Sequence, residues 1–127
     1  MKLYLAARYD RRQELGELAQ SIEQLGHAVT SRWLNGHGQE DADSALYDLT
    51  DVVLADGLEL FTEGARTRGR SGGRHVEFGY ALHAKKALFI VGPEENIFHG
   101  LPQVRRFADA DEFLDFLARP DLREAWP

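Results

Sequence analysis

Cysteine is absent from this chain of 127 residues. The absence excludes disulfides, a thiolate nucleophile, and zinc or iron–sulfur sites built on cysteine, and it fits a reducing cytoplasm. Long apolar runs are missing too. Residues 1–10 hold no apolar stretch long enough for a signal peptide, and no segment approaches the roughly 20 apolar residues of a membrane span. We therefore expect a cytoplasmic protein with no membrane partner.

Positive charge is in deficit, because 15 lysines and arginines face 21 acidic residues for a formal net charge of −6. An acidic protein is a poor partner for nucleic-acid polymers and anionic membranes. Arginines do recur between Arg66 and Arg74, but without interleaved aromatics they favour a compact phosphate over a nucleic acid. The five histidines show no metal-ligand spacing with carboxylates, so we predict no metal and no cofactor.

The length suits one domain, residues 1–127, without internal repeats or a linker. Apolar runs predict five strands. Their ranges are Lys2–Ala7, His27–Trp33, Gly57–Thr62, Ala87–Val91 and Val104–Phe107.

Helical periodicity fills the gaps between these strands. A first helix follows Asp10 as its N-cap and stops at Gly26, and a second runs from Glu40 to about Leu54. A third starts after Gly73 and ends near Lys86, and a fourth covers Asp111–Ala118, capped by Asp109 or Asp111.

Strands and helices thus alternate along most of the chain. This order predicts an α/β fold: a doubly wound, mostly parallel five-stranded sheet with helices on both faces, a flavodoxin-like three-layer sandwich. Ligands of such folds bind at the carboxyl ends of the strands. The loops Ala6–Arg12, Thr62–Gly73 and Gly92–Pro102 meet there, and their polar and glycine residues indicate a small-molecule site.

The segment Ser71–Ala81 passes from a loop rich in glycine and arginine into a helix that sets Glu77 in an early turn. A helix N-terminus favours negative charge, so we expect Glu77 to be ionised, as a nucleophile should be. Gly79 in the helix interior indicates close approach of a backbone or ligand. An ordinary helix with an acidic first turn would look the same.

Two further residues are candidates for chemistry. Tyr4 lies in an apolar strand, where its hydroxyl needs a partner; a backbone carbonyl would serve as well as a catalytic group. Asp48 is flanked by Tyr47 and Leu49 on a helix that packs on the sheet, although most helical aspartates are simply solvated.

A candidate phosphate cradle precedes the third helix. Ser71, Gly72, Gly73 and Arg74 combine a hydroxyl, flexible backbone amides and a guanidinium at a helix start. The Gly-Lys-Ser/Thr element of a Walker A motif is absent. A plain surface loop is the alternative.

In order and spacing, three motifs resemble the nucleoside 2-deoxyribosyltransferase family and the related nucleoside 5′-monophosphate N-hydrolases. They are the strand Leu3–Ala6 with its tyrosine, the aspartates Asp48 and Asp56 eight residues apart, and Glu77-Phe-Gly-Tyr-Ala81. The similarity covers Lys2 to about Leu117.

The resemblance implies roles for the three candidates. Glu77 would attack the anomeric carbon and form a glycosyl-enzyme intermediate, released to a new base or to water. Tyr4 would orient that carboxylate, and Asp48 would contact the base and protonate it as it leaves. The implied partner is a small nucleoside or nucleotide.

One position departs from the transferases, which tend to carry an aspartate six residues before the glutamate. This chain has Ser71, as the nucleotide-hydrolysing relatives do, where the serine contacts the 5′-phosphate. Arg8, Arg11 or Arg12 could add charge to the same phosphate. The resemblance also implies a homodimer with a subunit-bridging residue, for which Asn96 and His99 are candidates, and the tail with Trp126 fits a subunit contact.

Two alternatives to the enzyme remain. One is a non-catalytic nucleotide-binding or sensing module in the same crevice; the other is an NAD-cleaving enzyme on a related fold. The set of Tyr4, Asp48 and Glu77 favours the enzyme, since a binder needs no nucleophile. The chain is short for a dinucleotide.

Overall fold

A five-stranded sheet organises the computed structural model, which describes residues 1–36, 41–64 and 72–122. Every strand pair is parallel, in the order β2-β1-β3-β4-β5. The strands are β1 (Lys2–Ala6), β2 (Ala28–Val29), β3 (Gly57–Phe61), β4 (Ala87–Val91) and β5 (Val104–Phe107). This is the strand order of flavodoxin-like folds, so the predicted fold class is confirmed.

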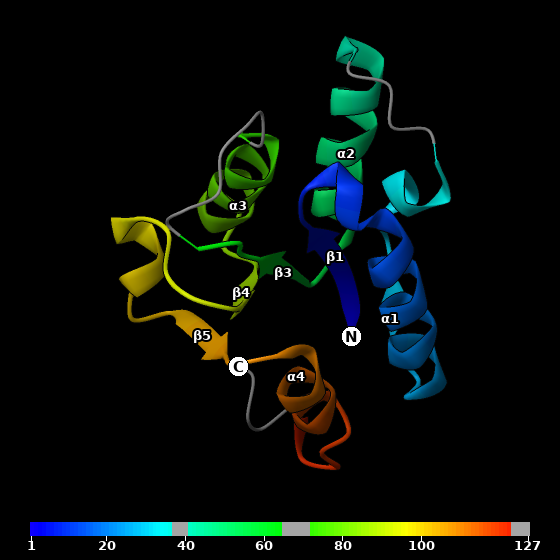
Figure 1. Ribbon diagram of the computed structural model, residues 1–127, viewed down its shortest axis with the longest axis vertical. Helices are drawn as coiled ribbons and strands as arrows, with labels where there is room; N and C mark the ends of the chain where they lie inside the picture. Colours follow the sequence, from blue (N-terminus) through cyan, green and yellow to red (C-terminus); the bar gives the residue numbers. More distant parts are fainter. Residues whose placement is uncertain (37–40, 65–71, 123–127) are drawn as a thin grey trace.

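Four α-helices cover the two faces of the sheet (Figure 1). They are α1 (Arg12–Gln24), α2 (Ala42–Leu54), α3 (Gly73–His83) and α4 (Ala110–Leu117). Short 3-10 helices, η1 (Tyr9–Arg11), η2 (Arg32–Asn35) and η3 (Ile97–Gly100), lie in the connections. Helices α2 and α3 pack together on one face, and α1 and α4 on the other.

Side-chain alternation along the strands assigns each residue to a face. Tyr4 pairs in register with Leu58, and Leu5 pairs with Glu59. Because successive side chains of a strand point to opposite faces, the first pair faces one helix layer and the second pair faces the other. Phe89 of β4 shares the face of Glu59 and packs its ring on Phe113 of α4. The face that carries Tyr4 is therefore the one under α2 and α3.

Helix starts differ slightly from the sequence prediction. Asp41 caps α2 and Asp109 caps α4, each accepting a backbone N–H from the residue three positions on. At α1, however, Asp10 lies inside η1, and the helix begins at Arg12 after a non-capping Arg11. The predicted Asp10 cap is therefore wrong, because a 3-10 turn takes up the first residues after β1.

The predicted second strand, His27–Trp33, is the largest difference. Only Ala28–Val29 forms a strand, and the chain then turns into η2. Asp51 of α2 accepts the backbone N–H of Arg32 at 3.0 Å, and the indole of Trp33 donates to the carbonyl of Leu5 at 2.8 Å. These contacts satisfy polar groups that a longer edge strand would leave open.

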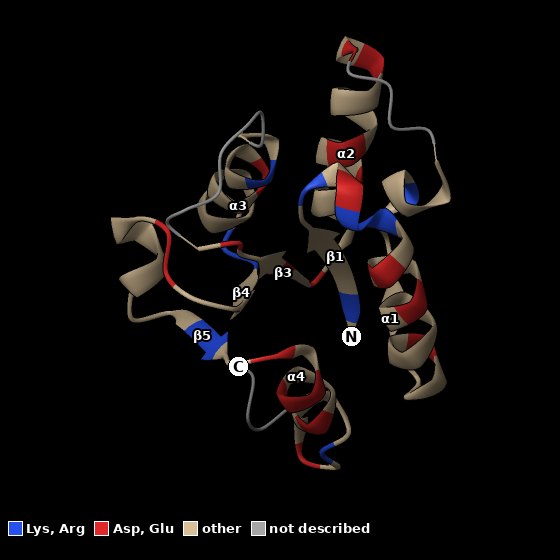
Figure 2. Cartoon of the chain, in the orientation of Figure 1, with Lys and Arg blue, Asp and Glu red and all other residues tan. Residues whose placement is uncertain are grey.

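Charge is spread unevenly over the surface. Acidic residues recur on α1, α2 and α4, while basic ones gather on β5 and at the turn between β1 and α1 (Figure 2). Among the described residues, no helix has the length and hydropathy that crossing a bilayer requires.

Candidate active site

A hydrogen bond between β1 and α3 forms the centre of the candidate site. The Tyr4 hydroxyl donates to Oε2 of Glu77, and the two residues lie 73 positions apart in the sequence. Tyr4 is fully buried in the middle of β1, and Glu77 is half-buried in the second turn of α3. Because β1 and β3 flank the point where the strand order reverses, this contact lies at the switch point of the sheet.

Asp48 belongs to the same electrostatic cluster. The charge of Asp48 raises the pKa of both Tyr4 and Glu77, so the three groups interact electrostatically. Helix α2 carries Asp48 on the half-buried side that packs toward α3 and β1. The structure thus brings together the three residues that the sequence nominated for chemistry.

The protonation states follow from burial. Burial, and then the charges of Glu77 and Asp48, raise the pKa of Tyr4 well above its usual value, so the phenol keeps its proton and remains a donor. Burial raises the pKa of Glu77 to about 8; the hydrogen bond from Tyr4 opposes this rise, and the charge of Asp48 adds to it.

This direction corrects the expectation that the helix dipole keeps Glu77 ionised. Glu77 is the fifth residue of α3, whereas the field of the unpaired N–H groups falls off within the first turn. Desolvation therefore outweighs the dipole.

The predicted phosphate cradle is only partly within the described residues, since Ser71 lies outside them. Gly72 and Gly73 form the start of α3 and are exposed, and no atom of the described residues outside this helix lies within 4 Å of where their Cβ would stand. Arg74 has a different partner from the one expected: its guanidinium, 3% exposed, lies 2.8 and 3.0 Å from the two carboxylate oxygens of Glu95. A guanidinium neutralised in this way is a poorer phosphate ligand.

Arg8 follows β1 at the carboxyl edge and is partly exposed, with Asp10 3.4 Å away. Arg11 contacts Glu14 and Glu63 at 2.8 and 3.0 Å, so its charge is already balanced by carboxylates.

The two candidates for a subunit bridge differ sharply. His99 is fully buried in its own chain, where Nδ1 accepts the backbone N–H of Glu95 at 3.0 Å. A side chain so enclosed cannot reach a second subunit. Asn96 is exposed and caps η3 by accepting the N–H of Phe98.

Gly79 does not show the close approach predicted for it. Within the described ranges, no atom outside its own helix lies within 4 Å of where its Cβ would stand, and the residue is exposed. Nothing in the structure explains the glycine at this position.

Sequence reasoning missed Asp51, which stands one turn after Asp48 on α2. Its carboxylate is buried and accepts from the backbone and the side chain of Arg32 at 2.9–3.2 Å. It fixes α2 to the segment after β2, and so holds the helix that carries Asp48. The signal was the three-residue spacing, which places two aspartates on neighbouring positions of one helix face.

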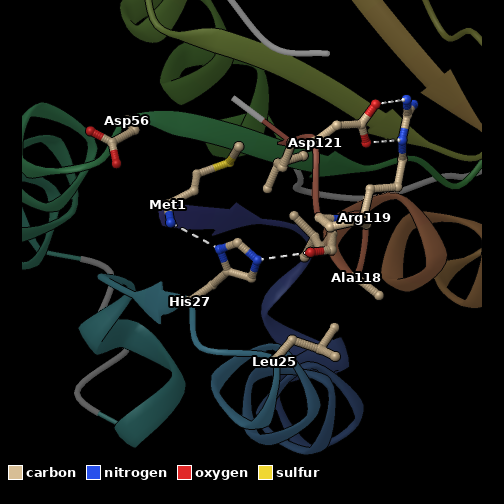
Figure 3. Close-up of a pocket in the computed structure, with 10 residues that line it drawn as sticks. Met1, Leu25, His27, Asp56, Ala118, Arg119 and Asp121 are labelled. Carbon is tan, nitrogen blue, oxygen red and sulfur yellow. Dashed lines mark hydrogen bonds and ion pairs between the residues drawn. The ribbon is translucent and has the colours of Figure 1, made fainter. Parts of the chain in front are cut away.

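A separate pocket of about 600 Å³ lies at the other end of the strands from Tyr4 and Glu77. It is lined by Met1, His27, Asp56 and residues 117–122 (Figure 3). Met1 and Asp56 precede β1 and β3, so this pocket is at the amino ends of the strands, away from Tyr4 and Glu77. His27 bridges the Met1 amine and the Leu117 carbonyl there at 2.8 and 2.9 Å. In the described part of the chain, no three histidine or acidic side chains are arranged to hold a metal ion.

Comparison with solved structures identifies this architecture. A 2-deoxyribosyltransferase from Bacillus psychrosaccharolyticus superposes with a TM-score of 0.71 at 18% identity, over 91% of this chain and 92% of that chain. The Clostridium botulinum CMP N-glycosidase BcmB superposes with a TM-score of 0.63 at 19% identity, over 91% of this chain and 96% of that chain. This chain shares the fold of both enzymes. Neither a protein-family model nor a curated protein matches the sequence.

The two comparisons confirm the expected resemblance at the level of the fold. By their names, one neighbour is a 2-deoxyribosyltransferase and the other an N-glycosidase of CMP. Their low identity leaves the reaction of this chain to be argued from its own residues.

Proposed function

We propose that this protein cleaves or exchanges the N-glycosidic bond of a nucleoside or nucleoside 5′-monophosphate. The observation that carries the proposal is the hydrogen bond from the buried Tyr4 hydroxyl to Glu77, with Asp48 in electrostatic contact with both. This set lies at the switch point of a fold shared with a deoxyribosyltransferase and a CMP N-glycosidase.

In the proposed reaction, ionised Glu77 attacks the anomeric carbon. A carbon–oxygen bond forms as the carbon–nitrogen bond breaks, and its electron pair leaves with the base. Asp48 must carry a proton at this step; it gives that proton to the departing base and becomes a carboxylate, while Tyr4 holds the attacking carboxylate in line. Water or a second base then attacks the glycosyl-enzyme and gives its proton to the Asp48 carboxylate, which restores both Glu77 and protonated Asp48.

The 5′-monophosphate is the preferred substrate class in this proposal. Ser71 matches the serine of nucleotide-hydrolysing relatives, and the exposed residues Gly72 and Gly73 stand at the start of α3. Exposed backbone N–H groups at a helix start favour a phosphate. Arg8 at the end of β1 adds positive charge on the same edge of the sheet.

We also propose that the protein acts as a homodimer. Helices α2 and α3 pack together and expose large apolar side chains: Leu46, Val53 and Leu54 on one helix, and Val76 and Tyr80 on the other. Leu46, 62% exposed, and Val76, 65% exposed, would be covered in a symmetric contact between two copies. Sedimentation of the wild type and of Val76→Glu tests this: the variant should be a monomer.

The non-catalytic binding module has one observation in its favour. A pKa of about 8 leaves much of Glu77 protonated at neutral pH, which weakens a nucleophile. If the protein is an enzyme, only molecules with ionised Glu77 turn over substrate, and their fraction increases with pH.

Incubation with a panel of nucleosides and monophosphates, with and without a free acceptor base, tests the function. Base released without acceptor indicates a hydrolase, and product formed only with acceptor indicates a transferase. Glu77→Ala should abolish either product, while Glu17→Ala, exposed on α1, should act like the wild type. Binding without any product would support the sensing module and refute the enzyme.

A further inference from the structure

The start of α3 is joined to the loop after β4 by a buried ion pair. The side chains of Arg74 and Glu95 are 3% and 9% exposed, and Nη2 of Arg74 reaches both carboxylate oxygens of Glu95 at 2.8 and 3.0 Å. Arg74 is the second residue of α3, and Glu95 lies between β4 and η3. A buried pair of this kind is strongly destabilising to break on one side, yet it adds little stability over apolar residues of similar size.

Its neighbours hold Glu95 in place. His99 accepts the backbone N–H of Glu95 at 3.0 Å, and its ring packs on His75 and Phe78 with centroids 5.6 and 5.3 Å away. Burial lowers the pKa of His99 and of His75, so at neutral pH both rings are neutral and the Nδ1 of His99 is able to accept. The loop that carries Glu95 is thus fixed by a group that is itself enclosed.

The same helix carries Glu77 one turn after Arg74. Residues three apart are neighbours on a helix surface. A fixed Arg74 therefore sets the rotation of α3 about its own axis and the position of Glu77 along that axis. Phe78 and Ala81 seat α3 on the sheet, but apolar contacts are not directional and allow a helix to slide or rotate slightly. Hydrogen bonds from a guanidinium to a carboxylate are directional, because they weaken as the N–H···O angle decreases.

We propose that the Arg74–Glu95 ion pair positions Glu77 against Tyr4 by fixing the first turn of α3 to the β4–η3 loop. Arg74 and Glu95 are positioning residues here, acting through Glu77. The inference rests on the proposed function for its kinetic consequence. Its structural consequence, the alignment of Glu77 with the Tyr4 hydroxyl, does not.

The kinetic test compares single and double replacements. Glu95→Gln and Arg74→Met should each lower kcat by about 10- to 100-fold with KM changed less than about threefold, because misplacing a reacting group acts mainly on the transition state. Both should also lower the melting temperature. Arg74→Lys keeps the charge on a shorter side chain without the planar guanidinium, so it should recover part of kcat.

The double variant Arg74→Met/Glu95→Leu separates positioning from stability. An apolar pair of similar volume should return the melting temperature to near the wild-type value. If the ion pair positions Glu77, kcat stays low in this stable protein. If kcat returns together with stability, the pair is merely structural and the proposal fails. Lys86→Met is the matched control. Lys86 follows the C-terminal end of α3 and donates a hydrogen bond of 2.8 Å to the carbonyl of Val53 on α2, so its loss should change kcat less than about twofold.

A second readout does not depend on turnover. The four tyrosines are labelled with ¹³C at Cζ and observed by NMR. The signal of Tyr4 is the one that disappears in Tyr4→Phe. Glu77→Gln gives the chemical shift of Tyr4 without its carboxylate partner. The double variant should move the Tyr4 signal toward that value, and Lys86→Met should leave it in place.

An unmoved Tyr4 signal in the double variant would overturn the positioning proposal. If instead the wild type turns over no nucleoside or nucleotide, the proposed function fails, and the Tyr4 signal alone decides whether the pair positions Glu77.

Discussion

At the scale of the residue, two opposite influences meet on the Glu77 carboxylate. Burial and the charge of Asp48 raise its pKa, while the hydrogen bond from Tyr4 lowers it. A nucleophile must be ionised, yet desolvation also strengthens its interactions with developing charge in the transition state. The balance between Tyr4 and Asp48 therefore decides what fraction of Glu77 is active at a given pH.

Tyr4→Phe should move the pH dependence of kcat/KM. Removing the phenol removes the donor that stabilises ionised Glu77, so the pKa of Glu77 rises above its value of about 8. The rising limb of the profile, which reports the free enzyme, should shift to higher pH, and activity at pH 7 should fall. Tyr9→Phe, whose ring is exposed, is the control and should keep the wild-type profile. A shift to lower pH in Tyr4→Phe would contradict this assignment.

Ser71→Asp tests the phosphate specificity predicted from the sequence. A carboxylate repels a 5′-phosphate but has little effect on an unphosphorylated sugar. We expect kcat/KM to fall at least about tenfold more for monophosphates than for the matching nucleosides, in line with the loss of about 1.4 kcal/mol that this ratio represents. Equal losses for the two classes, measured side by side, would remove Ser71 from the phosphate site.

At the scale of the element, the sequence predicted strands and helices well where local signals agree. The apolar run Ala87–Val91 and the strand Val104–Phe107 have the predicted bounds. The predicted second strand was too long, because its end is decided by Asp51 and by the carbonyl of Leu5, which are distant in sequence. The topology can be predicted from the order of strands and helices along the chain. The end of an element can depend on polar contacts with residues distant in sequence, which the sequence does not reveal.

The candidate site shows the same division. Tyr4, Asp48 and Glu77 could be nominated from motif spacing, but the partner of Arg74 could not. Glu95 lies in a loop with no periodic pattern, and only the folded chain brings its carboxylate to the start of α3. The raised pKa of Glu77 was equally out of reach, since it depends on burial by distant residues.

Asp109→Ala tests a local signal that the sequence did predict. Asp109 accepts the N–H of Glu112 at 2.9 Å, and α4 is only eight residues long. Loss of an N-cap costs about 1 kcal/mol. The free energy of unfolding, measured with urea, should fall by that amount, while Asp115→Ala on the exposed side of α4 should change it by less than about 0.5 kcal/mol. An unchanged Asp109→Ala would mean that packing of the helix alone fixes its start.

At the scale of the whole molecule, the two faces of the sheet carry carboxyl groups of different kinds. On the face under α2 and α3, Glu77 has a hydrogen-bond donor. On the face under α1 and α4, Glu59 of β3 is fully buried, and neither carboxyl oxygen has a hydrogen-bond partner among the described residues. Burial raises the pKa of Glu59 well above its usual value, so Glu59 is a neutral acid in the core.

Glu59→Leu should therefore stabilise the protein, and increasingly so as the pH rises. A group with a raised folded pKa contributes stability that is complete below its unfolded pKa of about 4.3 and is lost as the pH rises toward the folded value. The slope for such a group is about 1.4 kcal/mol per pH unit. Removing an unsatisfied buried carboxyl should add a further 1–3 kcal/mol or so at any pH.

Urea unfolding of the wild type and of Glu59→Leu at pH 5, 6 and 7 measures this difference directly. The pKa values of Glu77, His75 and His99 are shifted as well, but their contributions are common to both proteins. They cancel when the free energy of unfolding of the wild type is subtracted from that of the variant. The difference should grow from pH 5 to pH 7, whereas Glu17→Leu on the exposed side of α1 should give a difference that does not depend on pH. A constant difference for Glu59→Leu would mean that its carboxyl stays charged in the core, held by a partner in the folded chain that neutralises it.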